Sequence, residues 1–312
     1  MEKSHLNVSV VIPTYNRAHF LRESIESALS QTLPPEGVYV VDDASSDDTP
    51  RLMQQWYGGH PMVHYIRLSE NHGPAYARMR GVQAARAEWL AFLDSDDVWT
   101  PDHLEKAALI IHNHPHIRLI YAQRGHIDTN GDLITDRVAE TWSGSIMEVL
   151  LKRIVFRPSQ VVVHRTIYEE IISKLPLDYK EVYFGEDYIS GVLWAYYHGD
   201  KIYVSPHRTV LMRLHQGQSY HKVGLLKNNL LKAIEIIFER SDLPAYYKKM
   251  IISVNFYHVS YFMWRAGEWK RAWESFLEGV RTEPESVKIK DFWITLSRLL
   301  VPPQVRRFFR SA

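Results

Sequence analysis

Apolar runs and segments of helical periodicity alternate through residues 8 to 121. The runs that we expect to be buried strands are Val8–Ile12, Val38–Val41, Val63–Leu68 and Trp89–Leu93. Between and after them, apolar residues recur at helical spacing in Phe20–Leu29, Thr49–Trp56, Tyr76–Ala85 and Leu104–Ile111. Strands separated by such helices indicate βαβ units, and continuous apolar runs are typical of parallel strands covered on both faces. The pattern predicts an α/β fold with a mainly parallel central sheet flanked by helices.

The alternation weakens after residue 121. Val161–Val163 and Ile202–Val204 have the composition of further strands, and the chain becomes helical near residue 224. Gly267 predicts a turn, after which apolar residues in Trp269–Val280 recur at helical spacing. A hairpin of two helices cannot bury its apolar face alone, so we expect this one to pack on the domain. The expected organisation is a domain at residues 1–222, with halves 1–120 and 121–222, and a helical C-terminal region at residues 223–312.

The most informative polar segment is Asp94-Ser95-Asp96-Asp97, which directly follows the apolar run Trp89–Leu93. In an open α/β sheet, ligands bind just past the carboxyl ends of the strands. Three unneutralised carboxylates in four residues would repel one another there, and Mg²⁺ and Mn²⁺ favour carboxylate oxygens. The segment predicts a metal–diphosphate site. The alternative is an acidic turn that caps the next helix.

The first predicted strand is followed by Pro13-Thr14-Tyr15-Asn16-Arg17. Pro13 is expected to end the strand, and Thr14 or Asn16 to cap the next helix. The second strand is followed by Asp43, and further on by Asp47-Asp48, which suits a helix start. Because the ends of parallel strands meet at one edge of a sheet, we expect Asp43 to lie on the same edge as the acidic segment.

Composition narrows the classes of function. Of the 312 residues, 46% are hydrophobic and 23% charged, as in ordinary soluble proteins. The net charge of +1 provides no global field for nucleic acid, so we expect no nucleic-acid partner. The absence of cysteine excludes disulfides, thiolate metal sites and cysteine nucleophiles. The polar start Met1–Asn7 does not read as a signal peptide, and no run of ~18 apolar residues could span a membrane, so a cytoplasmic location is expected.

Three segments together resemble a known family. They are VSVVIPTYNRAHFLRESIESALSQT, VDDASSDDT and NHGPAYARMRGVQAARAEWLAFLDSDDVWTPDHL. In order, spacing and residue types they are similar to the nucleotide-binding half of family 2 glycosyltransferases, which have the Rossmann-like GT-A fold. The resemblance is close over residues 7–120 and loose to about residue 220. Met79 and Ala87 depart from it, because the family often has Asn and Gly there.

The resemblance implies a set of nucleotide-binding residues, which consists of Pro13, Thr14, Tyr15, Arg17, Asp43, Arg78, Asp94 and Ser95. Asp43 would read the base, usually uracil, because a carboxylate only accepts hydrogen bonds and can take the imide N–H. Asp94 would lie near the ribose. Asp96 would bind the Mn²⁺ or Mg²⁺ cofactor and bridge it to the diphosphate. For Arg78, the alternative to a contact with the nucleotide is a surface ion pair on its own helix.

Gly185-Glu186-Asp187 looks like the acidic pair of the family on the acceptor side. An inverting transfer needs a base that takes the proton of the acceptor hydroxyl, and Asp187 falls at that position. Gly185 would let the backbone approach the sugar, and Glu186 would touch the acceptor or donor sugar. The segment also suits a helix start, and the two interpretations are compatible.

Arg213-Leu214-His215 is a further candidate cluster. Some family members place a histidine here as a further metal ligand or a diphosphate contact, and His215 fits that place. Imidazole is a more usual ligand for Mn²⁺ than for Mg²⁺. Because the chain has 16 histidines, a surface histidine in a loop is the alternative.

Residues 292–310 mix aromatic, aliphatic and basic side chains, as suits the surface of an anionic bilayer. Many bacterial enzymes of this class act on lipid-linked acceptors. A peripheral contact of this tail with the inner face of the cytoplasmic membrane is therefore one expectation. A C-terminal helix docked on the body, with a frayed basic tail, is the other.

The resemblance implies a metal-dependent, inverting and non-processive transfer of one sugar from a nucleotide-diphospho-sugar, with a UDP-sugar expected. The acceptor would be a glycan or a lipid-linked molecule in bacterial cell-surface polysaccharide synthesis. A sugar nucleotidyltransferase is one alternative, although Pro13–Arg17 is not the Gly-rich basic loop that such an enzyme normally has. A non-catalytic nucleotide-sugar or glycan-binding module is the other, and the presence of both Asp96 and Asp187 argues against it.

Overall fold

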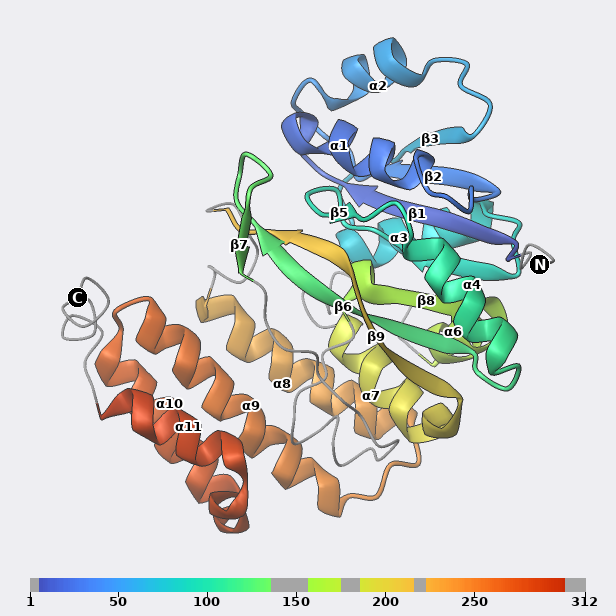
Figure 1. The fold of residues 1–312 in the computed structure, drawn as a ribbon. Coiled ribbons are helices and arrows are strands. Elements are labelled where there is room, and N and C mark those ends of the chain that lie inside the picture. The colour runs from blue at the N-terminus through green and yellow to red at the C-terminus, as the bar shows by residue number, and fades with distance from the viewer. Residues whose placement is uncertain (1–5, 136–156, 175–185, 216–222, 301–312) are drawn as a thin grey trace. The chain divides into compact units, whose positions relative to one another are not determined.

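The computed structural model of the chain describes residues 6–135, 157–174, 186–215 and 223–300 (Figure 1). The chain divides into two compact units. The first comprises residues 1–144, 156–183 and 197–215, and the second comprises residues 145–155, 184–196 and 216–312. The boundary that we expected after residue 222 stays a prediction.

One sheet forms the centre of the first unit. Within the described residues it has nine strands, which are β1 (Val8–Thr14), β2 (Gly37–Asp42), β3 (Val63–Arg67), β4 (Trp89–Phe92), β5 (Val98–Trp99), β6 (Leu119–Ile127), β7 (Leu133–Thr135), β8 (Val161–His164) and β9 (Ile202–Arg213). Their order is β3-β2-β1-β4-β8-β6-β9-β5, and β7 pairs with β6. The four strands at the β3 end are parallel, β8 is antiparallel to both neighbours, and β6 and β9 are parallel. The sheet is therefore parallel from β3 to β4 and mixed beyond β4.

Helices flank this sheet (Figure 1). They are α1 (Ala18–Leu29), α2 (Thr49–Tyr57), α3 (Pro74–Ala84), α4 (His103–Asn113) and α6 (Arg165–Ser173). The apolar runs and the helical repeats predicted from the sequence meet in one core, which includes Val10, Ile12, Leu21, Ile25, Val40, Ala91, Leu93 and Leu104. The predicted α/β class, with a central sheet flanked by helices, is confirmed.

One expectation about the strands is wrong. Pro13 does not end β1, because it pairs with Val41 of β2 and the strand continues to Thr14. The pairing of β1 with β4 stops at Val11, so a residue without an N–H can be accommodated beyond that point. The loop that follows β1 therefore begins at Tyr15.

The described part of the second unit is helical. It contains residues 186–196 of α7 (Glu186–His198), α8 (Val223–Arg240), α9 (Tyr246–Arg265), α10 (Trp269–Thr282) and α11 (Lys290–Leu299). Gly267, with φ of 84°, forms the predicted turn between α9 and α10. These two helices share an apolar core with α11, made of Tyr257, Val259, Met263, Trp264, Ala272, Phe276 and Leu299. The hairpin thus buries its apolar face with the help of a third helix.

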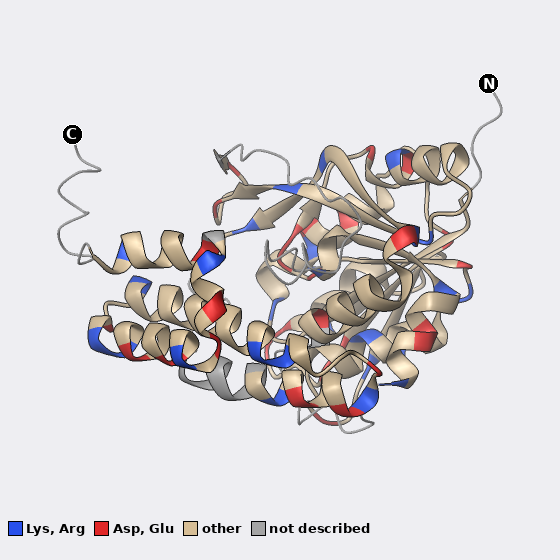
Figure 2. Ribbon diagram, turned by 90° about the horizontal axis from the view of Figure 1, so that it is seen from below, with Lys and Arg blue, Asp and Glu red and all other residues tan. Residues whose placement is uncertain are grey.

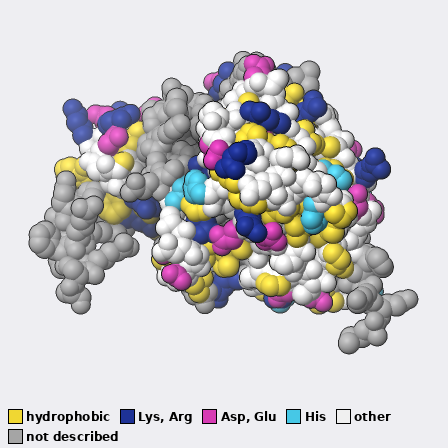
Figure 3. Space-filling model, turned by 90° about the horizontal axis from the view of Figure 1, so that it is seen from above, with side chains coloured by type: hydrophobic (Ala, Val, Ile, Leu, Met, Phe, Trp, Pro, Cys, Tyr) yellow, Lys and Arg dark blue, Asp and Glu magenta, His cyan; other side chains and the backbone are white. Residues whose placement is uncertain are grey.

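Charged residues of both signs are spread over the protein. Lys, Arg, Asp and Glu alternate along the C-terminal helices (Figure 2). Acidic and basic side chains are also interspersed with histidines on the face shown in Figure 3. This distribution agrees with the net charge of +1. Among the helices of the described residues, none combines the length and the apolar character that a membrane span requires.

Candidate functional site

The loops that follow β1 and β2 are tied together by Asn16, which adopts a left-handed conformation with φ of 51°. Its Oδ1 accepts the backbone N–H groups of Ser46 at 2.8 Å and Asp47 at 3.3 Å, and its own N–H donates to Ser45 Oγ at 2.9 Å. Asp47 Oδ2 in turn accepts the N–H of Ala18, the first residue of α1, at 3.2 Å. The expectation that Asn16 or Thr14 caps α1 is wrong, because the N-cap residue is Arg17, whose side chain makes no capping hydrogen bond. Asn16 fixes one loop on the other instead.

Asp43 lies at the end of β2 and is almost fully buried. Its two carboxylate oxygens accept the backbone N–H groups of His72 at 2.8 Å and Gly73 at 2.7 Å. Gly73 precedes α3 with φ of 91°, a conformation that favours glycine, and this presents both N–H groups at the start of the helix. Burial raises the pKa of Asp43, and the two backbone hydrogen bonds oppose that shift. Each oxygen retains capacity to accept a further donor.

Thr14 and Tyr15 lie beside Asp43 at the same edge. The N–H of Asp43 donates to the carbonyl oxygen of Thr14 at 2.9 Å. The Thr14 hydroxyl is buried, and within the described part of the chain it has no hydrogen-bond partner. The Tyr15 ring is exposed. A buried hydroxyl without a partner is unfavourable unless a ligand supplies one, so Thr14 is a candidate ligand contact.

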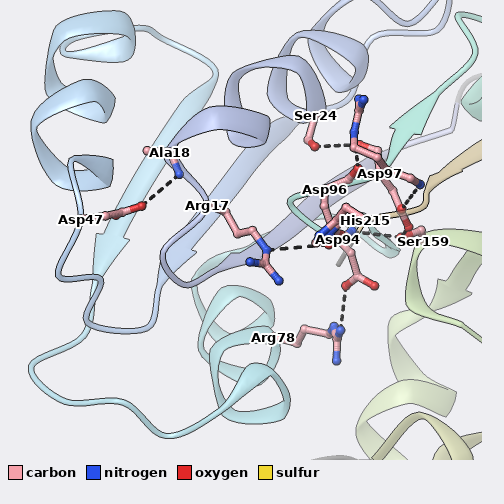
Figure 4. Close-up of polar contacts among 11 residues, drawn as sticks. Arg17, Ala18, Ser24, Asp47, Arg78, Asp94, Asp96, Asp97, Ser159 and His215 are labelled. Atoms are coloured by element: carbon pink, nitrogen blue, oxygen red, sulfur yellow. Dashed lines mark hydrogen bonds and ion pairs between the residues drawn. The ribbon is translucent and has the colours of Figure 1, made fainter. Parts of the chain in front are cut away.

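Asp94 follows β4 and is paired with Arg78 of α3. Arg78 Nη2 lies 2.8 Å from Asp94 Oδ1, and the Arg78 side chain is only 8% exposed (Figure 4). The alternative of a surface ion pair for Arg78 is therefore wrong. α3 comes close enough for this contact because it packs tightly on β1 at Gly81, where a Cβ would lie 2.4 Å from Val11 Cγ1.

Asp94-Ser95-Asp96-Asp97 forms a turn after β4, which we call the acidic turn. Asp97 is its buried carboxylate and holds the turn in place. Its carboxylate accepts the Ser159 hydroxyl at 2.6 Å and the backbone N–H of Arg213 at 3.1 Å. Ser159 Oγ also accepts the N–H of Asp94 at 3.0 Å, so one hydroxyl bridges both ends of the turn. Burial first, and then the neighbouring carboxylates, raise the pKa of Asp97 well above its usual range. Ser95 is buried within the same turn.

Asp96 is the carboxylate of the turn that faces the side chains of Arg17 and His215. Its Oδ2 lies 3.8 Å from Arg17 Nε and 2.9 Å from His215 Nε2 (Figure 4). The His215 side chain is 7% exposed, which does not fit the alternative of a surface histidine. Arg17, expected near the base, is thus placed beside the acid expected to bind the metal.

Asp96 and His215 together offer two ligand atoms to a divalent cation. An oxygen and an imidazole nitrogen are adjacent there, and both suit Mn²⁺. In the described ranges, no three His, Asp or Glu side chains are grouped as a metal site. Two protein ligands fit a cation that completes its coordination with diphosphate oxygens and waters. The residues therefore fit a cation shared with a bound diphosphate rather than one held by the protein alone.

Asp187 belongs to the second unit, where it lies in the first turn of α7. The prediction of a helix start here is confirmed, since α7 begins at Glu186. Tyr188, the next residue, accepts a hydrogen bond from Asn255 of α9 at its hydroxyl, at 2.8 Å. The side chain of Glu186 and the whole of Gly185 lie outside the described residues. The role of Asp187 as base stays a prediction.

Sequence reasoning missed two residues that organise the acidic turn. Ser159 lies in a short helical turn before β8, and only its contacts reveal its importance. Arg213 stands in the cluster that contained His215, but an arginine in a strand gives no signal of burial. The proximity of Arg213 to His215 was the available hint.

Comparison with known proteins identifies the family and the fold of the chain. Residues 9–169 match the family described as Glycosyl transferase family 2. The chain is 39% identical over 99 residues to a protein named as the teichuronic acid biosynthesis glycosyltransferase TuaG of Bacillus subtilis, which covers 32% of this chain and 39% of TuaG. It is 35% identical over 129 residues to a chondroitin synthase of Escherichia coli, covering 41% of this chain and 19% of that protein. It is 44% identical over 100 residues to the succinoglycan biosynthesis protein ExoO of Rhizobium meliloti, covering 32% and 28%. The matched part spans less than two fifths of the length of each relative.

Solved structures show the same fold. The crystal structure of S. aureus TarS matches 90% of this chain and 50% of TarS, with a TM-score of 0.62 and 21% identity. TarS 1–349 in complex with UDP-GlcNAc matches 91% and 92%, with a TM-score of 0.54 and 18% identity. The mannosyltransferase PcManGT from Pyrobaculum calidifontis, in complex with GDP-Man and Mn²⁺, matches 97% and 82%, with a TM-score of 0.56 and 16% identity. At these identities the likeness establishes the GT-A fold and no substrate.

Proposed function

Because this chain belongs to glycosyl transferase family 2, we propose that it transfers one sugar from a nucleotide-diphospho-sugar to an acceptor hydroxyl, with inversion. The observation that carries the proposal is the gathering of Arg17, Asp96 and His215 past the carboxyl end of β4. This is the place at which an open α/β sheet binds a ligand. A diphosphate needs both cationic side chains and a cation site, and this cluster offers both.

The base of the donor would lie at the ends of β1 and β2. The Asp43 carboxylate, held by two backbone N–H groups, would accept the imide N–H of uracil through its remaining lone pairs. The buried Thr14 hydroxyl would gain the partner that the described residues do not provide. The exposed Tyr15 ring would stack on the base. The structure of TarS 1–349 with UDP supports a UDP-sugar as donor, although GDP-Man is the ligand of PcManGT.

The diphosphate would lie at the acidic turn. Asp96 and His215 would hold Mn²⁺ or Mg²⁺, and a cation there neutralises charge on the leaving nucleoside diphosphate. We assign Arg17 to the diphosphate rather than to the base, because its guanidinium lies beside Asp96. Arg78 holds Asp94 in a fixed orientation, so that the carboxylate can accept hydrogen bonds from the ribose hydroxyls.

On the acceptor side, Asp187 would take the proton from the attacking hydroxyl. Asp187 lies in the first turn of α7, and a carboxylate can act as the base of such a transfer. Asn255 and Tyr188 hold the start of this helix within the second unit. Glu186 and Gly185 would contact the sugars.

The acceptor would be a glycan or a lipid-linked molecule of cell-surface polysaccharide synthesis, carried out in the cytoplasm. The names of the relatives, which concern teichuronic acid, succinoglycan and chondroitin, support this setting. A peripheral contact with an anionic membrane is supported by Trp293 of α11 and Leu300, the residue that follows α11, which are 61% and 66% exposed. They directly precede the basic tail that contains Arg306, Arg307 and Arg310.

The test measures nucleoside diphosphate release from a panel of UDP-, GDP-, TDP- and CDP-sugars with Mn²⁺, Mg²⁺ or EDTA. We expect metal-dependent release from one donor, and its loss in Asp187→Asn and Asp96→Asn. Asp187→Asn should still bind the nucleotide in calorimetry, since Asp187 acts on the acceptor. Asp48→Asn is the matched control, because Asp48 is an exposed acid that pairs only with Arg51 among the described residues.

Transfer that survives in Asp187→Asn would refute the assignment of the base. Metal-dependent nucleotide binding that is unchanged in Asp96→Asn would refute the assignment of the metal ligand. If no donor releases nucleotide and calorimetry detects no nucleotide binding, the protein is not a transferase of this kind, and a glycan-binding module becomes the better explanation.

A further inference from the structure

Arg213, the last residue of β9, is a buried cation with an extensive set of partners. Its side chain is 1% exposed. The guanidinium donates to the carbonyl oxygens of Asp96 at 3.1 Å and of Asp128 at 3.0 Å, and it pairs with Glu23 of α1 at 2.5 Å. It also lies over the ring of Phe20, 4.9 Å from its centroid. One side chain therefore joins the acidic turn, α1 and the turn between β6 and β7.

Two hydrogen bonds join Arg213 to the acidic turn, and Arg213 is the donor in both. The Arg213 side chain donates to the backbone oxygen of Asp96, and the Asp97 side chain accepts the backbone N–H of Arg213. His215 follows two residues later, and its Nε2 lies 2.9 Å from the carboxylate of Asp96. These two bonds connect the segments that carry Asp96 and His215, immediately beside both residues.

A buried guanidinium is favourable only when its donors are paired with good geometry. Lysine in its place would keep the charge, but a single ammonium cannot reproduce a planar fork that reaches three segments. The acidic turn would then lose the side-chain bond at Asp96 and keep only the backbone bond from the end of β9 to Asp97. The separation of Asp96 and His215 would no longer be fixed, while the loops at Asp43 and Thr14 would keep their own contacts.

We propose that Arg213 is the positioning residue of the cation site, which sets Asp96 and His215 at the spacing that binds a divalent cation with the donor diphosphate. The inference rests on the proposed function, because it takes Asp96 and His215 as the ligands. It assigns Arg213 no contact with substrate. Groups that orient metal ligands typically contribute ~10–100-fold to metal affinity.

The experiment measures Mn²⁺ affinity in the presence of saturating UDP, from the electron paramagnetic resonance signal of free Mn²⁺. The variants are Arg213→Lys, His215→Ala and the double variant, with Arg208→Lys as the matched control. Arg208 lies on the same strand but is exposed. We expect Arg213→Lys to weaken Mn²⁺ binding at least ~10-fold. The double variant should bind Mn²⁺ no more weakly than His215→Ala, because Arg213 acts through that ligand pair.

A second measurement separates positioning from general damage. Calorimetry of UDP in EDTA should give the same affinity for Arg213→Lys and the unaltered protein, because the base-binding edge keeps its contacts. If Arg213→Lys does not fold, Glu23→Gln removes the charge that pairs with Arg213, and we expect a smaller loss of Mn²⁺ affinity with the same UDP affinity.

Four results would overturn the proposal. Unchanged Mn²⁺ affinity in Arg213→Lys, or in Glu23→Gln where that variant replaces it, would do so. So would a double variant in which the fold-losses of Mn²⁺ affinity of the two single variants multiply. A loss of metal-free UDP affinity as large as the loss of Mn²⁺ affinity would also overturn it. If His215→Ala binds Mn²⁺ normally, the cation site of the proposed function is wrong, and the role of Arg213 is wrong with it.

Discussion

His103 makes the stability of the first unit sensitive to acid. The side chain is buried against the paired strands β5 and β9, with its ring stacked on Trp99 at a centroid distance of 4.2 Å. Nδ1 shares a hydrogen bond with Thr209 Oγ1 at 2.7 Å, whereas Nε2 has no partner among the residues that the structure describes. Burial lowers the pKa of His103 from 6.5 to about 3. The imidazole is therefore neutral in the folded protein, and the unfolded chain takes up the proton first.

The sign and size of the effect follow from this pKa difference. Below pH 6.5 the unfolded state binds one more proton than the folded state, until the folded pKa is reached near 3. The contribution of the neutral His103 to the free energy of unfolding is therefore fully present above pH 6.5. It is lost as the pH falls through this window. Each pH unit costs about 1.4 kcal/mol for one proton. Between about pH 7.5 and about pH 5, His103 alone should lower the free energy of unfolding by about 2 kcal/mol.

The assay compares urea unfolding of the unaltered protein and His103→Gln at these two pH values. Glutamine can keep the hydrogen bond to Thr209 but does not titrate, so its pH-dependent loss should be smaller by about 2 kcal/mol. His112→Gln is the control, because His112 is exposed near the end of the same helix, α4, and should leave the pH dependence unchanged. If His103→Gln loses as much stability between the two pH values as the unaltered protein, the buried neutral imidazole is not the cause.

Two further predictions concern the nucleotide edge and the C-terminal helices. Asn16→Gly keeps the left-handed backbone but removes the acceptor for the N–H groups of Ser46 and Asp47, so calorimetry should show UDP affinity reduced by about tenfold. Asn16→Asp keeps the acceptor and should bind UDP more tightly than Asn16→Gly. Equal affinities would contradict the role of Asn16 in joining the two loops. The double variant Trp293→Ser and Leu300→Ser should sediment less with phosphatidylglycerol vesicles than the unaltered protein, whereas binding that persists would exclude α11 as the membrane contact.

In residues 1–120, β1, β2 and β4 could be predicted because each is a largely continuous apolar run. The candidate site could be predicted for a related reason. Parallel strands place their carboxyl ends at one edge, so the acids that follow β2 and β4 are brought there by topology. Both inferences depend on local sequence and on a general rule of the fold.

The second half of the sheet could not be predicted in the same way. In β6, Gln123, Arg124 and His126 interrupt the apolar residues, and the strand is defined by its pairing with β8 and β9. β9 extends far beyond the short apolar segment at its start for the same reason. The burial of Arg213 depends on Glu23, which is 190 residues away in the sequence. No periodicity reports such contacts.

The acidic turn shows why a cluster of carboxylates is a weaker argument for a metal than its density indicates. From the sequence, mutual repulsion among Asp94, Asp96 and Asp97 was the reason to expect a cation. In the structure Asp94 is neutralised by Arg78, and Asp97 is satisfied by a serine hydroxyl and a backbone N–H while burial raises its pKa. Repulsion is therefore largely relieved without a metal. What remains is the position of Asp96 beside an imidazole and a guanidinium, which are groups that a cation and a diphosphate would each engage. The case for a cation thus depends on the partners of one carboxylate, and substitutions at His215 and Arg213 test it more directly than substitutions of the other two acids.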